Sequence, residues 1–278
     1  SGQLNRRFSD RFEATIAYTY TKSEDVQSLT SDRAISNWRN GRQLSDAHEN
    51  LQTANSVFSR PGRLLAYGTY SLPWKGVSTD LTVYYERTSG VPISYVAGGG
   101  NSDLNGDGYN GNDLLYIPRD TSEIRIGTGV DGSFVKNVVA AQAFQRFIDA
   151  QPCLAEQRGH IMKRDSCRSP TQNRLDVSLR QSIPQFRGHQ LALQLDFFNF
   201  LNFLNKNWGQ IRLPTLNPTF PDQRALSQTG RNAGPLNQSI PTFTFDNRLY
   251  DATTGAAKPF EGRISSVYQI QLTLRYSF

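Results

Sequence analysis

The sequence predicts an all-β fold, an antiparallel transmembrane β-barrel segment of about six strands with long extracellular loops. The first observation is the end of the chain, where residues 263–278 alternate apolar and polar side chains. Successive side chains of a strand point to opposite faces, so this segment predicts one strand with an apolar face and a polar face. The second observation is that long and short connections alternate, as antiparallel strands crossing a bilayer require. The third is that no run of about 18 apolar residues exists, which excludes a transmembrane helix.

Six strands follow from this alternation, taken in chain order. They are expected near residues 8–22, 62–72, 79–95, 172–184, 189–203 and 263–278. Short turns near 73–76 and 185–188 join the second strand to the third and the fourth to the fifth. Long connections cover about 23–59, 96–171 and 204–262. We expect the turns on the periplasmic side and the long connections on the extracellular side, which places the C-terminus in the periplasm.

The two faces are cleanest in the fourth strand, where Leu175, Val177 and Leu179 alternate with polar residues. The second strand is less regular, because Leu65 and Tyr67 lie opposite its other apolar residues. In a transmembrane barrel the apolar faces contact lipid and the polar faces line the lumen. The charged lumen-facing candidates are Arg174, Asp176, Arg180, Asp196 and Arg275.

Aromatic residues gather at the predicted strand ends, where amphipathic rings favour the headgroup level. The group at the inner interface comprises Tyr70, Trp74, Phe186, Tyr276 and Phe278. The group at the outer interface comprises Tyr18, Tyr20, Tyr95, Phe200 and Phe203. Aromatic residues favour strands in any sheet, so an ordinary strand preference is the alternative.

The composition and motifs argue against two functional classes. The formal net charge is +6, but no basic run and no nucleic-acid recognition motif appear, so nucleic acid is not an expected partner. Three histidines lie in separate segments, and no G-x-S-x-G, Walker A or dinucleotide-binding fingerprint is present. We therefore expect no enzyme activity.

The two cysteines, Cys153 and Cys167, lie in a polar segment. Buried spectator thiols normally lie in apolar runs, so the segment favours a disulfide formed outside the cytoplasm. A metal site is the weaker interpretation, because only His160 lies nearby and no C-x2-C spacing exists.

One loop matches the start of a calcium-binding pattern. Residues 103–109 read DLNGDGY, which fits D-x-[DN]-x-[DN]-G. Asp103, Asn105 and Asp107 would supply side-chain oxygens, and Tyr109 a main-chain carbonyl. Position 12 is Leu114 rather than glutamate, and Asp113 would substitute for it only in an irregular loop. The alternatives are a structural calcium site and an ordinary surface turn rich in Gly, Asn and Asp.

Six strands do not close a membrane barrel, since single-chain bacterial barrels have at least about 8. Unpaired strand edges are costly in hydrocarbon. Either the long connections contain further strands, or the chain is one part of a larger wall. The abrupt start at SGQLNRRF favours the second expectation, a C-terminal fragment that lacks its plug and N-terminal domain.

The order of several short motifs resembles one family. AYTYTKS precedes a long connection, then RPGRLLAYGTYSLP, SGVPIS, NSDLNGDGYNGNDLLYIPRD, SPTQNRLDVSLRQSIP and FFNFLNFLN follow, and the chain closes on RYSF. This order resembles the C-terminal barrel portion of a TonB-dependent outer-membrane receptor, of the Oar-like kind that carries a carboxypeptidase-regulatory-like domain. The resemblance covers nearly the whole chain.

The resemblance implies a barrel of about 22 strands whose lumen is blocked by a plug. It implies four partners besides outer-membrane lipid: the plug of the same protein, an energy-coupling inner-membrane protein, the barrel-assembly machinery and a ligand of unknown identity. The terminal strand resembles the signal that the assembly machinery reads, carried by Leu272, Leu274, Tyr276 and Phe278.

The expected function is therefore ligand capture at the extracellular loops and import through a plugged barrel of the bacterial outer membrane. A passive porin-like barrel and a surface adhesion or structural protein are alternatives that use the same strands. A secreted soluble β enzyme is the alternative from another class.

Overall fold

The computed structural model describes residues 1–40, 52–98, 103–186, 189–217, 222–231 and 240–278. Its main sheet has seven strands in the order β1-β2-β5-β6-β14-β15-β20, and every neighbouring pair is antiparallel. The strands are β1 (Gly2–Ser9), β2 (Phe12–Tyr20), β5 (Gly62–Trp74), β6 (Val77–Thr88), β14 (Gln172–Phe186), β15 (His189–Phe198) and β20 (Gln269–Ser277). The sheet is open, since β1 and β20 each pair on one side in the described chain.

The register of the main sheet separates two chemically distinct faces. One row across six strands is apolar and comprises Phe12, Tyr70, Leu81, Leu179, Leu195 and Leu272. The adjacent row is polar and comprises Glu13, Thr69, Thr82, Ser178, Asp196 and Gln271. Apolar side chains remain exposed, with Leu272 68% and Leu274 65% accessible. The all-β, antiparallel fold class is therefore as predicted, and the apolar face is not sealed inside a protein core.

The first predicted strand, 8–22, is wrong in its boundaries. The structure places a tight turn at residues 10–11 between β1 and β2, so the main sheet has seven strands rather than six. Phe8 and Phe12 flank the turn, and their rings stack with centroids 5.2 Å apart. Apolar alternation therefore continues through the turn, which hid the hairpin in the sequence pattern.

Three other predicted strands are shorter than expected. The 79–95 segment splits at Gly90 into β6 and a separate strand, β7 (Pro92–Gly98). A Cβ on Gly90 would lie 1.7 Å from the carbonyl oxygen of Ser169, so glycine permits the two segments to meet there. The 189–203 segment ends as a strand at Phe198, and helix α4 (Phe200–Leu204) follows.

The terminal strand begins at Gln269, not at Arg263. Residues Ile264–Ser266 form a short 3-10 helix, η5, in which the Ser266 hydroxyl donates to the carbonyl of Arg263 at 2.5 Å. Ser266 is also the position where the apolar alternation breaks. The break at Ser266 therefore lies in the short helix that precedes β20.

The long connections fold into a second body, here called the loop domain and defined as residues 92–168 and 212–262. Its seven-stranded sheet has the order β11-β10-β18-β17-β7-β13, with β8 also paired to β7. These strands are β7, β8 (Asp113–Leu114), β10 (Arg125–Thr128), β11 (Val135–Lys136), β13 (Cys167–Arg168), β17 (Asp222–Arg231) and β18 (Pro241–Phe245). Two pairs are parallel, β10 with β18 and β17 with β7.

Smaller elements complete the connections. The helices are α1 (Ala34–Asn40), α2 (Val138–Asp149), α3 (Pro152–Ala155) and the 3-10 turns η2 (Asp131–Ser133) and η4 (Asn247–Leu249). The two-stranded pairs are β3 (Glu24–Asp25) with β4 (Ala54–Asn55), β9 (Tyr116–Ile117) with β12 (His160–Ile161), and β16 (Arg212–Pro214) with β19 (Phe260–Gly262). No helix within the described ranges has the length and apolarity that a bilayer crossing needs.

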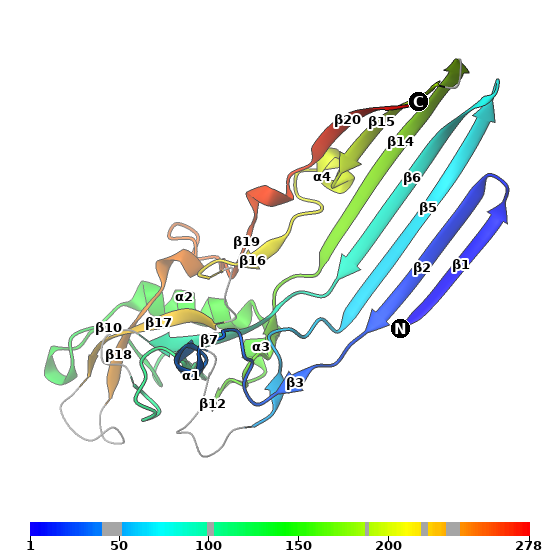
Figure 1. Cartoon of the computed structure of the whole chain (residues 1–278). Helices are drawn as coiled ribbons and strands as arrows, with labels where there is room; N and C mark the ends of the chain where they lie inside the picture. Colours follow the sequence, from blue (N-terminus) through cyan, green and yellow to red (C-terminus); the bar gives the residue numbers. More distant parts are fainter. Residues whose placement is uncertain (41–51, 99–102, 187–188, 218–221, 232–239) are drawn as a thin grey trace.

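Helix α2 covers the loop-domain sheet with an amphipathic face. Its Phe144, Phe147 and Ile148 are fully buried, and the Phe147 ring packs against Tyr95 and Phe245 with centroids 5.1 and 5.4 Å apart. Asn137 caps the helix by accepting the backbone N–H of Ala140 at 3.0 Å. Figure 1 shows the loop domain at one end of the main sheet and the short turns at the other.

Candidate functional site

The five lumen-facing candidates all lie on the polar face of the main sheet. In the register, Asp176 lies opposite Tyr84, Arg180 opposite Asp80 and Asp196 opposite Ser178, while Arg275 lies opposite Ala192. The structure does not bring the five together. Arg174 and Asp176 lie near the loop domain, and Arg180 and Arg275 border a separate hollow of about 430 Å³ near the short turns.

A charged cluster lies on the polar face where β5, β6 and β14 approach the loop domain. Arg63 Nε contacts Glu86 Oε1 at 2.7 Å, and the Tyr84 hydroxyl donates to Glu86 Oε2 at 3.2 Å. On the neighbouring strand, Arg174 contacts Asp176 at 2.8 Å. Of these residues, the sequence predicts Arg174 and Asp176 as lumen-facing and Glu86 as a residue of the barrel wall. The Arg63–Glu86 pair itself was not predicted, because it is made across two strands and depends on their register.

A cavity of about 620 Å³ adjoins this cluster, bordered by Glu86, Arg174, Asn199, Val267 and Gln269 among others. Asn199 ends β15 in the left-handed conformation at φ 53°. Its backbone N–H donates to Asp176 at 2.8 Å, and its side chain donates to the carbonyls of Gly209 and Ser266. The cavity thus offers both signs of charge together with amide groups.

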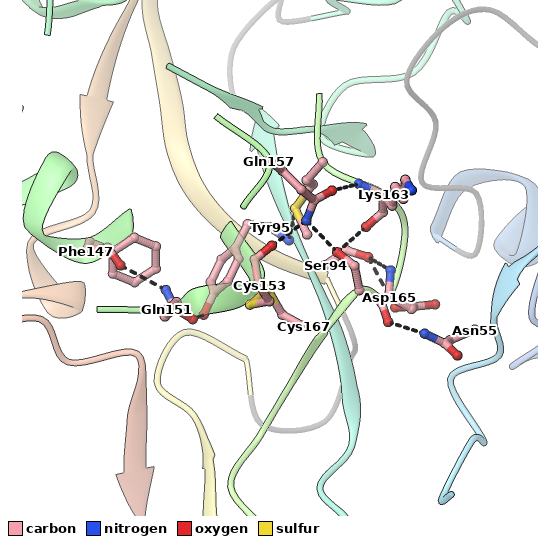
Figure 2. The surroundings of a disulfide bond; sticks show 12 residues. Asn55, Ser94, Tyr95, Phe147, Gln151, Cys153, Gln157, Lys163, Asp165 and Cys167 are labelled. Carbon is pink, nitrogen blue, oxygen red and sulfur yellow. Dashed lines mark hydrogen bonds between the residues drawn. A yellow bond between two sulfur atoms is a disulfide. The ribbon is translucent and has the colours of Figure 1, made fainter. Parts of the chain in front are cut away.

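Cys153 and Cys167 form a disulfide, as the sequence predicts, with their Cα atoms 5.3 Å apart. The bond ties α3 to β13, which pairs with β7. Figure 2 shows the polar contacts around it, including the Tyr95 hydroxyl, which donates to Gln151 Oε1 at 2.6 Å. Burial raises the pKa of Tyr95 far above its usual value, so this hydroxyl stays a donor.

Among the described side chains of the two predicted interface groups, Tyr95 is contradicted by the structure. It is 1% exposed and belongs to the loop-domain core, so it cannot lie at a membrane interface. Its strand, β7, is separated from β6 of the main sheet around Gly90, and Gly90 with Pro92 was the local signal of that break. The side chain of Phe186, from the predicted inner-interface group, lies outside the described residues.

The predicted calcium loop folds around the carboxylate of Asp103. Asp103 Oδ1 accepts the backbone N–H groups of Gly106 and Asp107 at 2.7 and 3.0 Å, and Oδ2 accepts that of Gly108 at 2.9 Å. Gly108 has a φ of 82°, the left-handed turn that the sixth position of such a loop requires. Asp113 Oδ1 accepts the backbone N–H of Asn105 at 3.0 Å, so the carboxyl at position 11 is directed to this loop.

The electrostatics of this loop are unusual. Burial, opposed by backbone hydrogen bonds and assisted by the charges of Asp107 and Asp103, raises the pKa of Asp113 to about 7. Across the described chain, no three His, Cys, Asp or Glu side chains group closely enough to hold a metal by themselves. A calcium site would therefore need amide and main-chain oxygens as well, as calcium loops normally do.

Contacts between the connections join the loop domain to the first long connection. Arg164 is 8% exposed and contacts Asp25 at 2.8 Å, and Asn55 Nδ2 donates to the carbonyl of Asp165 at 3.0 Å. Arg168 donates to the carbonyl of Ser59 at 3.0 Å. Burial alone would raise the pKa of Asp25, but hydrogen bonds from Ser28 and Arg164 outweigh it and hold the pKa below its usual range. These contacts have no sequence signal, since they join positions more than a hundred residues apart.

The barrel-assembly candidates lie on one face of the terminal segment. Leu272, Leu274 and Tyr276 point from β20 to the exposed apolar side, and Phe278 is 97% exposed at the chain end. Tyr276 contacts His189 of the neighbouring strand through its hydroxyl at 2.7 Å. The structure therefore places the four side chains together, while their recognition by assembly machinery stays a prediction.

Comparison with known proteins identifies one family. No curated protein and no solved structure gives a significant match to the chain. A family profile described as an outer membrane beta barrel domain matches residues 2–212. The match spans the main-sheet strands from β1 to β15 and the first part of the loop domain. It supports an outer-membrane location without distinguishing a TonB-dependent receptor from other barrels, and the chain belongs to the outer membrane β-barrel domain family.

Proposed function

We propose that the chain forms part of the wall and outer surface of a TonB-dependent outer-membrane receptor. The receptor binds a ligand at the long connections and imports it through a plugged barrel. The observation that carries the proposal is the division of the chain into a two-faced sheet and a folded loop domain at one end of it. We propose no catalytic step for the chain, because the charged residues of the cluster are paired with each other, as Arg63 with Glu86 and Arg174 with Asp176.

The open edges of the main sheet support a larger barrel. In the described residues β1 pairs only with β2, and β20 only with β15. Each edge therefore presents unpaired backbone N–H and C=O groups. In hydrocarbon, every such unpaired group costs several kcal/mol of free energy. We propose that further strands continue the wall at both edges, and that the polar face then lines the lumen.

The lengths of the connections support the orientation, and the disulfide is compatible with it. Disulfides persist outside the cytoplasm, and the Cys153–Cys167 bond lies in the loop domain. Short turns face the periplasm in outer-membrane barrels, whereas long loops face outward. We therefore place the loop domain outside the cell and Phe278 in the periplasm, where the assembly machinery would read the terminal strand.

A passive porin-like barrel is the second candidate, and the polar face of the main sheet favours it equally. Conductance across planar bilayers separates the two, using the full-length protein that contains this chain. An importer should conduct little until about 4 M urea loosens its plug, because denaturant weakens packed domains first where they are least stable. Steady conductance without urea would support the porin, and none under either condition would favour a surface adhesion protein.

A further inference from the structure

We propose that residues 103–113 form a Ca²⁺-binding loop on the loop domain. Its side-chain ligands are Asp103, Asn105, Asp107 and Asp113, joined by the main-chain carbonyl of Tyr109. The three carboxylates are not grouped around one point in the described structure, so the loop has to tighten when it binds the ion. The proposal is independent of transport, because it concerns how the loop domain is held together.

The first support is the shape of the loop. The backbone turns around Asp103 through three N–H donors, as described above, and Asn105 Oδ1 accepts the backbone N–H of Asp107 at 2.9 Å. These bonds hold the first, third and fifth positions of the pattern on one short arc. A calcium loop uses the same positions, with oxygen ligands about 2.3–2.6 Å from the ion.

The second support is a buried carboxylate oxygen with no partner. Asp113 is 2% exposed, and its Oδ2 makes no hydrogen bond. Its other oxygen is bonded to Asn105, which fixes the carboxyl against the loop. Asn112, 3% exposed, also leaves its Oδ1 without a partner, while its Nδ2 donates to Asp107 at 2.7 Å. Orphaned buried oxygens at a turn of this pattern indicate an oxygen-seeking cation.

Asp113 also resolves the mismatch with the pattern. It belongs to β8, whose pairing with β7 sets Asp113 opposite Ala97. The strand therefore fixes the backbone of the residue, and its side chain turns back to the loop. Asp113, at position 11, can therefore supply the carboxylate ligand that glutamate supplies at position 12 of a regular loop.

The third support is uncompensated negative charge. Among the described residues, no ion pair involves Asp103, Asp107 or Asp113. Two basic side chains lie close to the loop without pairing with these carboxylates in the described chain: Arg231 donates to the main-chain carbonyl of Asp103 at 3.2 Å, and the Arg224 guanidinium lies against Gly111. Buried charges normally have a partner, and a hard divalent cation would supply it here.

The loop also forms one wall of a cavity that is partly open to solvent. A cavity of about 610 Å³ is bordered by Leu104, Asn105, Asp113, Leu114 and Phe243 among others. Two of the proposed ligands therefore belong to its lining. A bound ion would hold this wall in place, which explains why a charged loop lies beside apolar side chains.

Calorimetric titration of the full-length protein with CaCl2 in detergent micelles tests the proposal. We expect one saturable site in the affinity range of extracellular calcium modules, about 10⁻⁴–10⁻³ M or tighter. Asp113→Asn keeps the shape and one oxygen but removes the charge, and it should weaken binding at least tenfold. Asp120→Asn is the matched control, because Asp120 is an exposed loop carboxylate whose hydrogen bonds in the described chain go to Ser122, and it should leave binding unchanged.

Hydrogen exchange on the same samples gives a second readout. Calcium should slow exchange in peptides that cover 103–117, whereas peptides from α2 should not respond. If Asp113→Asn does not fold, Asp103→Asn provides the same comparison from the other end of the loop. The proposal is overturned if no saturable binding appears, if MgCl2 binds equally well, or if both folded variants bind calcium like the unaltered protein. If a proton rather than calcium neutralises Asp113, no saturable calcium binding should appear.

Discussion

The main sheet and the loop domain differ in where their apolar side chains lie: exposed on one face of the sheet, and buried in a core in the loop domain. Every buried member of the hydrophobic cluster lies in the loop domain, between Ile93 and Leu249. The main sheet leaves Leu272, Leu274 and their counterparts exposed. The loop domain therefore gains stability by removing apolar surface from water, whereas the main sheet requires an apolar solvent on one face. Substitutions in each region should fail for different reasons, and that difference can be measured.

The largest effect is expected in the core of the loop domain. Phe147 is fully buried between Tyr95 and Phe245, so Phe147→Ala removes a ring and leaves a cavity. We expect a loss of about 3–5 kcal/mol in the unfolding free energy of the loop domain. Hydrogen exchange should rise in peptides from α2 and β18 but not in β14 or β15. Equal destabilisation of both regions would show that they unfold as one unit.

A charge on the apolar face should instead damage the main sheet, and only in a bilayer. Leu179 lies near the middle of β14 and is 41% exposed. Leu179→Arg should cost about 2–4 kcal/mol when the protein is unfolded from phospholipid vesicles, because arginine at the midplane is poorly solvated. Ser178→Arg lies one residue away on the polar face and serves as the control. Similar losses from the two variants would contradict the assignment of lipid and lumen faces.

Removal of the disulfide should have a somewhat smaller effect, again confined to the loop domain. The bond closes a segment with a sequence separation of 14, and chain entropy suggests a contribution of up to about 3 kcal/mol. The double variant Cys153→Ser with Cys167→Ser should lower the unfolding midpoint of the loop domain under oxidising conditions. Under a strong thiol reductant the unaltered protein should approach the variant. An unchanged midpoint would show that hydrophobic packing, not the bond, holds α3 to β13.

The two regions also differ in how far the sequence predicts them. In the main sheet, side-chain alternation is a local signal. It located β14 and most of the terminal strand, and it placed Arg174 and Asp176 on the polar face. It failed at the Phe8–Phe12 hairpin, where the apolar period runs through the turn. In the loop domain the pairing of β7 with β17 joins residues more than a hundred positions apart, and no local period encodes that pairing. The disulfide was predictable because two cysteines allow one connectivity, whereas the Arg164–Asp25 contact was not.

The smallest expected effect concerns that contact, which connects the loop domain to the first long connection. The pKa of Asp25 is lowered in the folded protein, so the ionised carboxyl contributes stability above the usual carboxyl pKa and loses it as pH falls through the folded value. A partly exposed pair of this kind is worth under about 1 kcal/mol. Asp25→Asn keeps an acceptor for Arg164 without the charge, so it should reduce loop-domain stability at pH 7 and have less effect as the pH falls through the folded pKa of Asp25. Chemical unfolding followed by hydrogen exchange in β3 and β13 would measure the difference, and an equal loss above and below the folded pKa would mean that the contact acts through shape alone.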